Sequence, residues 1–174
     1  NGRFSPHNLN ETPLPVTSSK TYEIIPMDDG KKYQKKYNNL IVLENDLYVK
    51  SKNEYEAYDA VFVLRPESIV RSADLSEPVT DFKRGLVLAF CENHANAEDL
   101  DVADLRAIAA GQQGFDVVYP AIGDHLDFLN RLRDDSGVAL YFLKRPEDVF
   151  CWHYAKKGFF NFKKHIPDMM SFVR

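Results

Sequence analysis

Residues 85–143 read GLVLAFCENHANAEDLDVADLRAIAAGQQGFDVVYPAIGDHLDFLNRLRDDSGVALYFL, and this stretch decides the fold. Three short apolar runs, at residues 86–90, 115–119 and 138–143, alternate with two segments in which apolar residues recur at helical spacing. A continuous apolar run is typical of a strand that is buried on both faces. The pattern therefore predicts a three-stranded β-α-β-α-β layer, with helices over residues 97–110 and 124–136.

Signals at the ends of the two expected helices support this interpretation. The first turn of each helix is rich in acids, which interact favourably with the positive end of the helix dipole. Asp124 can cap the second helix, and Gly111 and Gly137 stand where the C-terminal caps would lie. The firmest structural prediction from the sequence is thus the segment 86–145.

Outside this segment the signals are weaker. Residues 1–19 contain three prolines and few apolar residues, which predicts an irregular N-terminal arm. Residues 20–75 favour strands: runs at 40–43 and 47–49 around a three-residue loop predict a hairpin, and 60–64 predicts a further strand. We therefore expect one domain over residues 20–174, of the α/β or α+β class, with a β-rich N-terminal half and an aromatic, basic C-terminal cap over 146–174.

Composition excludes few classes of function. Hydrophobic residues make up 44% of the chain, charged residues 28%, and the net charge is −4. No apolar run approaches the ~20 residues that a membrane-spanning helix needs, so we predict a soluble, cytoplasmic protein without a membrane partner. Two cysteines, Cys91 and Cys151, do not make a disulfide scaffold and are expected to be reduced thiols.

Four residues are candidates for catalysis: Cys91, His94, Asp124 and His125. If the three expected strands are parallel, their carboxyl ends share the edge at which α/β sheets bind ligands. A thiol beside an imidazole is the minimum for a cysteine nucleophile, and a carboxylate could orient the imidazole. The competing interpretation is that Cys91 is a small buried residue.

Metal and cofactor signatures are weak in this sequence. Structural zinc sites use closely spaced Cys and His pairs, and the chain has no such pair. The turns after residues 90 and 119 carry no glycine-rich phosphate-binding pattern. We therefore predict no metal and no cofactor.

Two surfaces are candidates for binding. Acids crowd residues 92–135, among them Asp99, Asp101, Asp104 and Asp127, and such a surface can steer a basic protein partner. Lysines and aromatic residues interleave at residues 31–37 and 156–165. This pattern is typical of proteins that bind single-stranded nucleic acid. In the second patch the candidates are Lys156, Lys157, Phe159 and Lys163.

Three functions follow from these candidates. The sequence favours a protein-binding or inhibitory domain that acts through its acidic face. The first alternative is a hydrolase or transferase with a Cys/His/Asp site at the sheet edge. The second is a nucleic-acid-binding module that uses the two lysine and aromatic patches. Whether the protein is an enzyme is left open by the sequence.

Overall fold

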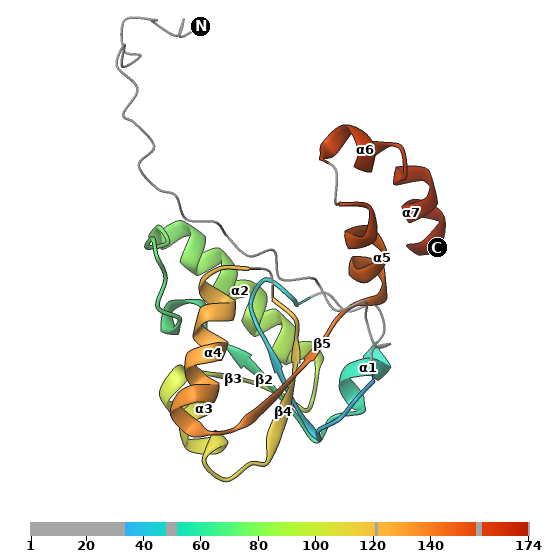
Figure 1. Ribbon diagram of the computed structural model, residues 1–174. Coiled ribbons are helices and arrows are strands. Elements are labelled where there is room, and N and C mark those ends of the chain that lie inside the picture. Colours follow the sequence, from blue (N-terminus) through green and yellow to red (C-terminus); the bar gives the residue numbers. More distant parts are fainter. Residues whose placement is uncertain (1–33, 48–51, 121, 156–157, 174) are drawn as a thin grey trace, which may run out of the picture.

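The computed structural model describes residues 34–47, 52–120, 122–155 and 158–173 (Figure 1). The expected arm over residues 1–19 lies outside this range. The elements, in chain order, are β1 (Asn39–Val42), α1 (Lys52–Glu56), β2 (Ala60–Leu64), the 3₁₀ turn η2 (Pro66–Ser68), α2 (Glu77–Asn93), β3 (Ala97–Leu100), α3 (Val102–Ala109), β4 (Gly114–Val118), α4 (Asp124–Ser136), β5 (Ala139–Leu143), α5 (Pro146–Tyr154), α6 (Phe159–Lys163) and α7 (Ile166–Val173).

Within the described residues, five strands form one parallel sheet in the order β3-β2-β1-β4-β5. β1 is the first of these strands in the sequence, yet it lies in the centre, where Leu40 is opposite Val61 of β2 and Asp116 of β4. The chain builds outward from β1 through β2 to β3, and then returns to the other side of β1 for β4 and β5. The α/β class is confirmed, whereas a sheet of three strands was too small.

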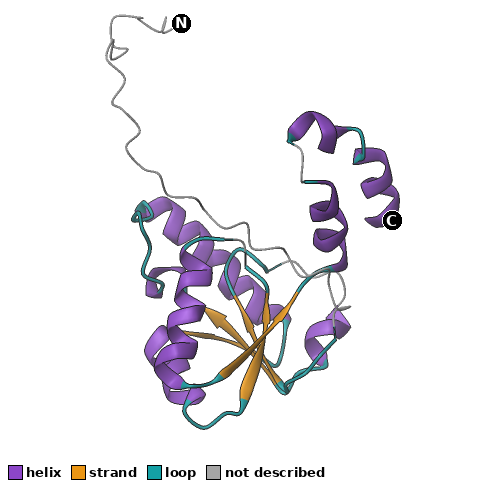
Figure 2. Ribbon diagram, viewed as in Figure 1, coloured by secondary structure: helices purple, strands orange, loops and turns teal. Residues whose placement is uncertain are grey.

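Helices cover both faces of the sheet (Figure 2). Ile41 of β1 belongs to a core formed with α3 and α4, while its neighbour Leu40 belongs to a core formed with α1 and α2. Because successive strand residues point to opposite faces, the inner strands must be apolar at nearly every position. The continuous apolar runs at residues 40–43 and 115–118 have this origin, apart from Asp116.

The predicted strand at residues 86–90 is wrong, because these residues form the second half of α2. A short apolar run cannot be distinguished from a helical segment by periodicity alone. Within this run only Val87 and Phe90 are buried, whereas Leu86 and Leu88 remain 43% and 46% exposed. The apolar side chains of this run therefore point to several sides of α2, and the run is not a buried strand.

The predicted helix over residues 97–110 is in fact two elements, β3 and α3. β3 lies at one edge of the sheet, where a strand tolerates polar residues, and Glu98 faces solvent there. Asp101 then begins α3, since its carboxylate accepts a hydrogen bond from the backbone N–H of Asp104 at 2.8 Å. Acids that were interpreted as a helical first turn thus belong to an edge strand and a helix cap.

The predicted hairpin at residues 40–49 is also wrong. Both sides of β1 are occupied by parallel strands, so a returning antiparallel strand has no place beside it. The chain turns after Leu43, whose carbonyl accepts a hydrogen bond from the N–H of Asp46 at 2.8 Å. Residue 47 is irregular and residues 48–49 lie outside the described range. The N-terminal half is a β-α-β unit.

The later part of the expected layer is correct in outline. β4, α4 and β5 lie within one residue of their predicted bounds. α4 spans Asp124–Ser136, so Asp124 is its first residue, and Gly123 stands at the N-cap position predicted for Asp124. Gly137 follows the last residue, and its φ of +69° is the left-handed conformation that favours glycine at a helix C-terminus. The strand at residues 60–64 is confirmed as β2.

Helices α5, α6 and α7 lie beyond the end of β5, apart from the helices that flank the sheet (Figure 1). They leave large apolar side chains in solvent, with Phe159 and Phe160 exposed by 65% and 83%. In the described part of the chain, no helix has the length and apolar character to cross a bilayer.

Candidate functional site

We call the region just beyond the carboxyl ends of β1 and β4 the crevice, because the strand order reverses between these two strands. In an open α/β sheet, ligands bind where the order of strands reverses, and here that point lies between these two strands. Glu44 follows β1 by two residues, and His125 is the second residue of α4, which follows β4. Residues that are 81 positions apart in the sequence meet at this point.

Glu44 is the centre of this site. Its side chain is fully buried, and both carboxylate oxygens lie 3.0 Å from Nε2 of His125. Nη2 of Arg71 lies 2.5 Å from Oε1, and Nζ of Lys83 lies 3.3 Å from the same oxygen. Burial by itself would raise the pKa of Glu44, but the hydrogen bonds and charges of His125 and Arg71 outweigh burial and lower the pKa to about 2. Glu44 is therefore an ionised carboxylate that holds three basic side chains together.

The contact with Glu44 fixes the orientation and tautomer of His125. An ionised carboxylate only accepts hydrogen bonds, so Nε2 of His125 carries a hydrogen, and in the neutral ring Nδ1 is the basic nitrogen. Nδ1 lies 3.5 Å from the side-chain nitrogen of Asn45, and the His125 side chain is 13% exposed. Glu44 thus holds the imidazole at Nε2, and in the neutral ring Nδ1 accepts a long hydrogen bond from the side-chain amide of Asn45.

A second carboxylate in the same loop has the opposite character. Asp46 is buried, and burial raises its pKa, although the positive charge of Arg145 acts in the other direction. Nη2 of Arg145 lies 3.3 Å from Asp46, while its Nε lies 2.7 Å from Asp148. Two neighbouring acids with pKa values that move apart are a feature of sites that use one group as an acid and another as a base.

Asp124 has a positioning role in this arrangement. Its carboxylate accepts hydrogen bonds from the backbone N–H of Ser72 at 3.0 Å and from the hydroxyl of Ser72 at 3.3 Å. Ser72 follows Arg71 directly, so Asp124 ties the loop after β2 to the start of α4. This tie holds Arg71 beside Glu44.

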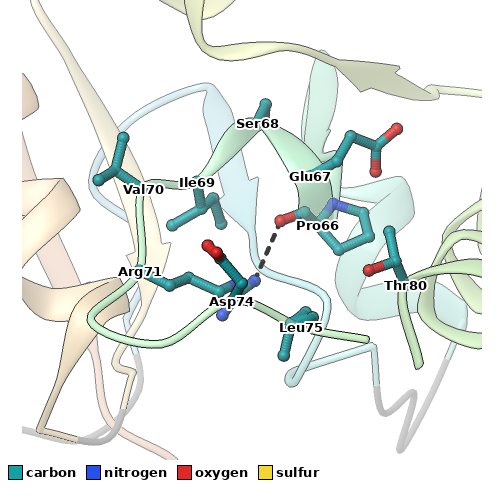
Figure 3. Close-up of a pocket in the computed structure, with 9 residues that line it drawn as sticks. All are labelled: Pro66, Glu67, Ser68, Ile69, Val70, Arg71, Asp74, Leu75 and Thr80. Atoms are coloured by element: carbon teal, nitrogen blue, oxygen red, sulfur yellow. Dashed lines mark hydrogen bonds between the residues drawn. The ribbon is translucent and has the colours of Figure 1, made fainter. Parts of the chain in front are cut away.

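A pocket of about 430 Å³ lies on the other side of Arg71 (Figure 3). The loop that follows β2 forms most of its wall, and Thr80 of α2 completes it. Arg71 extends along the pocket, and its Nη2 donates to the carbonyl of Pro66 at 3.2 Å. The same guanidinium therefore lines the pocket and contacts Glu44.

The structure does not bring Cys91 and His94 to this site. α2 runs back from the carboxyl edge of the sheet to its amino edge, and these two residues lie at its end, directly before β3. The His94 ring is buried, stacks on Phe90 at 4.2 Å, and its Nδ1 lies 2.8 Å from the Phe90 carbonyl. Of the four predicted catalytic residues, Asp124 and His125 thus lie at the carboxyl edge of the sheet. Cys91 and His94 lie at its amino edge.

The Cys91 thiol is expected to be unreactive. Burial, with the charges of Asp99 and Glu98, raises the pKa of Cys91 to about 11, and only the thiolate reacts with thiol reagents. In a Cys151→Ser background we expect the native protein to react at pH 8 roughly 100-fold more slowly than free cysteine. A rate equal to that of free cysteine would contradict this prediction, and the unfolded protein serves as the control.

Protonation of Glu44 should make stability depend on pH in the acid range. The native pKa of about 2 lies below the ordinary value of 4.5, so the unfolded chain binds this proton more readily than the native protein does. The ionised Glu44 carboxylate therefore contributes to the free energy of unfolding. This contribution is fully present above pH 4.5 and is lost as the pH falls toward 2. It amounts to about 3 kcal/mol.

Urea denaturation between pH 6 and pH 2.5 measures this effect. The slope of stability against pH should be smaller in the Glu44→Gln variant than in the wild type. The exposed Glu92 provides a matched control, since Glu92→Gln should leave the slope unchanged. Equal slopes in all three proteins would show that Glu44 does not couple folding to protonation.

Two acids of the predicted acidic face already have partners within the protein. Asp99 forms an ion pair of 2.6 Å with Arg65, and Asp101 caps α3. Asp104 on α3 and Asp127 on α4 are exposed, and their two helices pack on the same face of the sheet. Fewer acids are therefore available to bind a partner than the number of acids in the sequence indicates.

The predicted lysine and aromatic patches fall partly outside the described residues. Lys156 and Lys157 are among these, as are residues 31–33. Phe159 and Lys163 lie at the two ends of α6 and are exposed. Nucleic-acid binding stays a prediction.

The described residues contain no group of three or more His, Cys, Asp or Glu side chains that could hold a metal ion. The carboxylates at the crevice instead face cations. The residues that the sequence did not identify are Glu44, Asp46, Arg71, Lys83 and Arg145. A signal for the first existed, since Glu44 directly follows an apolar run in the same way as the predicted candidates do.

In comparisons with protein-family models, curated proteins and solved structures, nothing matches this chain. The functional argument therefore rests on the geometry of the crevice.

Proposed function

We propose that this domain is a hydrolase or transferase whose reaction takes place at the crevice between β1 and β4. The observation that carries the proposal is the contact between His125 and the buried, ionised Glu44 across the point where the strand order reverses. A base held in one tautomer by a carboxylate is the arrangement that general base catalysis requires. An ion pair that only stabilised the fold would not need to lie at the point where the strand order reverses.

In this proposal each group of the crevice has a role. Nδ1 of His125 takes the proton of a water or hydroxyl nucleophile, while the nucleophile's oxygen forms its bond to the electrophilic centre of the substrate. As the bond to the leaving group breaks, the imidazolium of His125 gives its proton to the leaving group. Glu44 stabilises the imidazolium that forms on His125. The positively charged Lys83 lies beside Glu44.

The composition of the crevice argues against a nucleotide as the substrate. Dinucleotides bind in such sheets at a glycine-rich turn after the first strand, whereas the turn after β1 reads Leu43-Glu44-Asn45-Asp46. Two carboxylates in that turn would repel a pyrophosphate. A substrate with little negative charge near the first turn fits better.

The test is a panel of p-nitrophenyl esters, anilides and phosphate monoesters, assayed with the wild type and the His125→Ala variant. Hydrolysis by the wild type that is lost in the variant supports the proposal. Equal rates for both proteins on every substrate would overturn the assignment of His125. A pH–rate profile then reports the pKa values of the acid and base.

A second candidate is a protein-binding domain that acts through its acidic face. It is favoured by Asp104 and Asp127, which are exposed on two helices that cover the same face of the sheet. The double variant Asp104→Lys, Asp127→Lys should then slow association with a basic partner such as lysozyme by about 10-fold at low salt. If the reversal of both charges leaves association unchanged, this face is a solvated surface only.

A further inference from the structure

We propose that the pocket beside Arg71 binds the carboxylate of a small organic acid that has an apolar tail. This inference rests on the proposed function, because it identifies the end of the substrate that is held while the crevice carries out the reaction. It is carried by the unused donors of Arg71, by the apolar wall of the pocket and by Asp74, which also lines it.

Arg71 has donors that no described residue accepts. Its side chain is only 10% exposed, and both of its hydrogen bonds, to Glu44 and to the carbonyl of Pro66, come from Nη2. Nε is buried and has no hydrogen-bond partner among the described residues. A buried donor without a partner is costly, and the guanidinium fork matches the two oxygens of a carboxylate.

The wall of the pocket determines the rest of the ligand. Pro66, Ile69, Val70 and Leu75 present an apolar surface, and Val70 is 71% exposed. A volume of about 430 Å³ is within the range of small-molecule sites. Glu67 and Asp74 also line the pocket. Glu67 is paired with Arg84 at 2.6 Å, so the negative charge of Asp74 is the one that disfavours a dianion such as a phosphate monoester. The pocket thus fits a monocarboxylate with a short aliphatic chain.

Ligand binding can be measured by NMR titration, without turnover. The probes are 4-methylpentanoate, its neutral amide 4-methylpentanamide, and 3-methylbutyl phosphate. We expect the carboxylate to bind with a Kd on the order of 1 mM, and the amide and the phosphate at least 10-fold more weakly. Acetyl-glycyl-leucine, as free acid and as amide, tests whether the carboxylate can come from a peptide C-terminus.

Variants locate the bound carboxylate. Arg71→Lys should weaken binding of 4-methylpentanoate at least 10-fold, and Asp74→Asn should strengthen binding of 3-methylbutyl phosphate. Because Arg71 also contacts Glu44, Val70→Asp is the second variant: it places a negative charge on an exposed wall residue and should abolish carboxylate binding. Val79→Asp is its matched control, since Val79 is half exposed on α2 and does not line the pocket.

The outcomes separate this inference from the proposed function. If no carboxylate binds the wild type, or if Val70→Asp and Val79→Asp bind 4-methylpentanoate equally, the inference is overturned, whatever the activity of His125. If the carboxylate binds as described while the wild type turns over no substrate, the inference stands and the proposed function fails.

Discussion

The His125→Ala variant is expected to lower kcat/KM by about 10²- to 10⁴-fold, the usual contribution of a general acid or base. The imidazole is the group in the crevice whose basic nitrogen is not occupied by a carboxylate, because Glu44 holds only Nε2. Its removal leaves the nucleophile without a proton acceptor, while Lys83, Arg71 and Asp46 stay in place. The loss should appear mainly in kcat. Steady-state kinetics on the best substrate of the panel measures it.

Two controls distinguish this role from a structural one. The exposed His153 on α5 is a matched histidine, and His153→Ala should keep the wild-type rate. Added imidazole should restore part of the activity of His125→Ala, which it cannot do if the variant is merely distorted. A variant that keeps more than a tenth of the wild-type kcat/KM would remove His125 from the mechanism.

The Asp116→Ala variant is expected to lose about 3–5 kcal/mol of folding free energy, because three hydrogen bonds to a buried carboxylate are removed together. Asp116 is fully buried in β4. Its carboxylate accepts hydrogen bonds from the backbone N–H groups of Lys36 and Tyr37, at 2.8 and 3.0 Å, and from the Tyr58 hydroxyl at 3.0 Å. Without the carboxylate the backbone N–H groups of Lys36 and Tyr37 lose their acceptor, and the segment before β1 loses these bonds to β4.

Chemical denaturation at pH 7 measures this loss. Asp59→Ala removes an exposed aspartate next to Tyr58 and should change stability by no more than about 0.5 kcal/mol. The ring of Tyr37 also packs where a Cβ on Gly114 would lie, so a variant that frees this segment should expose Tyr37 to solvent as well. If Asp116→Ala lies within about 1 kcal/mol of the wild type, the network does not hold the segment.

The sequence predicted those elements whose signals are local. α4 has acids at its start, an apolar face and a glycine at its end, and β4 and β5 are apolar runs between turn residues. All three are found close to their expected positions. The failures came from α2 and β3, where an apolar run belongs to a helix and an acidic tetrapeptide belongs to an edge strand. Only tertiary packing decides these two cases.

The site could be predicted only in part, for a related reason. His125 and Asp124 were identified because they start a helix after a predicted strand. Glu44 was assigned to a hairpin turn, since nothing local shows that its strand occupies the centre of a parallel sheet. The strand order brings together residues that are 81 positions apart, and the same order separates Cys91 and His94 from them. Strand order is a global property that a single sequence does not reveal.

The central position of β1 has a consequence for biosynthesis. β1 is the first described strand that a ribosome would make, but one of its two neighbours, β4, contains residues that come more than 70 positions later. Until residue 118 has emerged from the ribosome, one side of an apolar strand has no native partner, and contacts between distant residues form slowly. We therefore expect the nascent chain to need protection from aggregation in the interval between the emergence of β1 and that of β4.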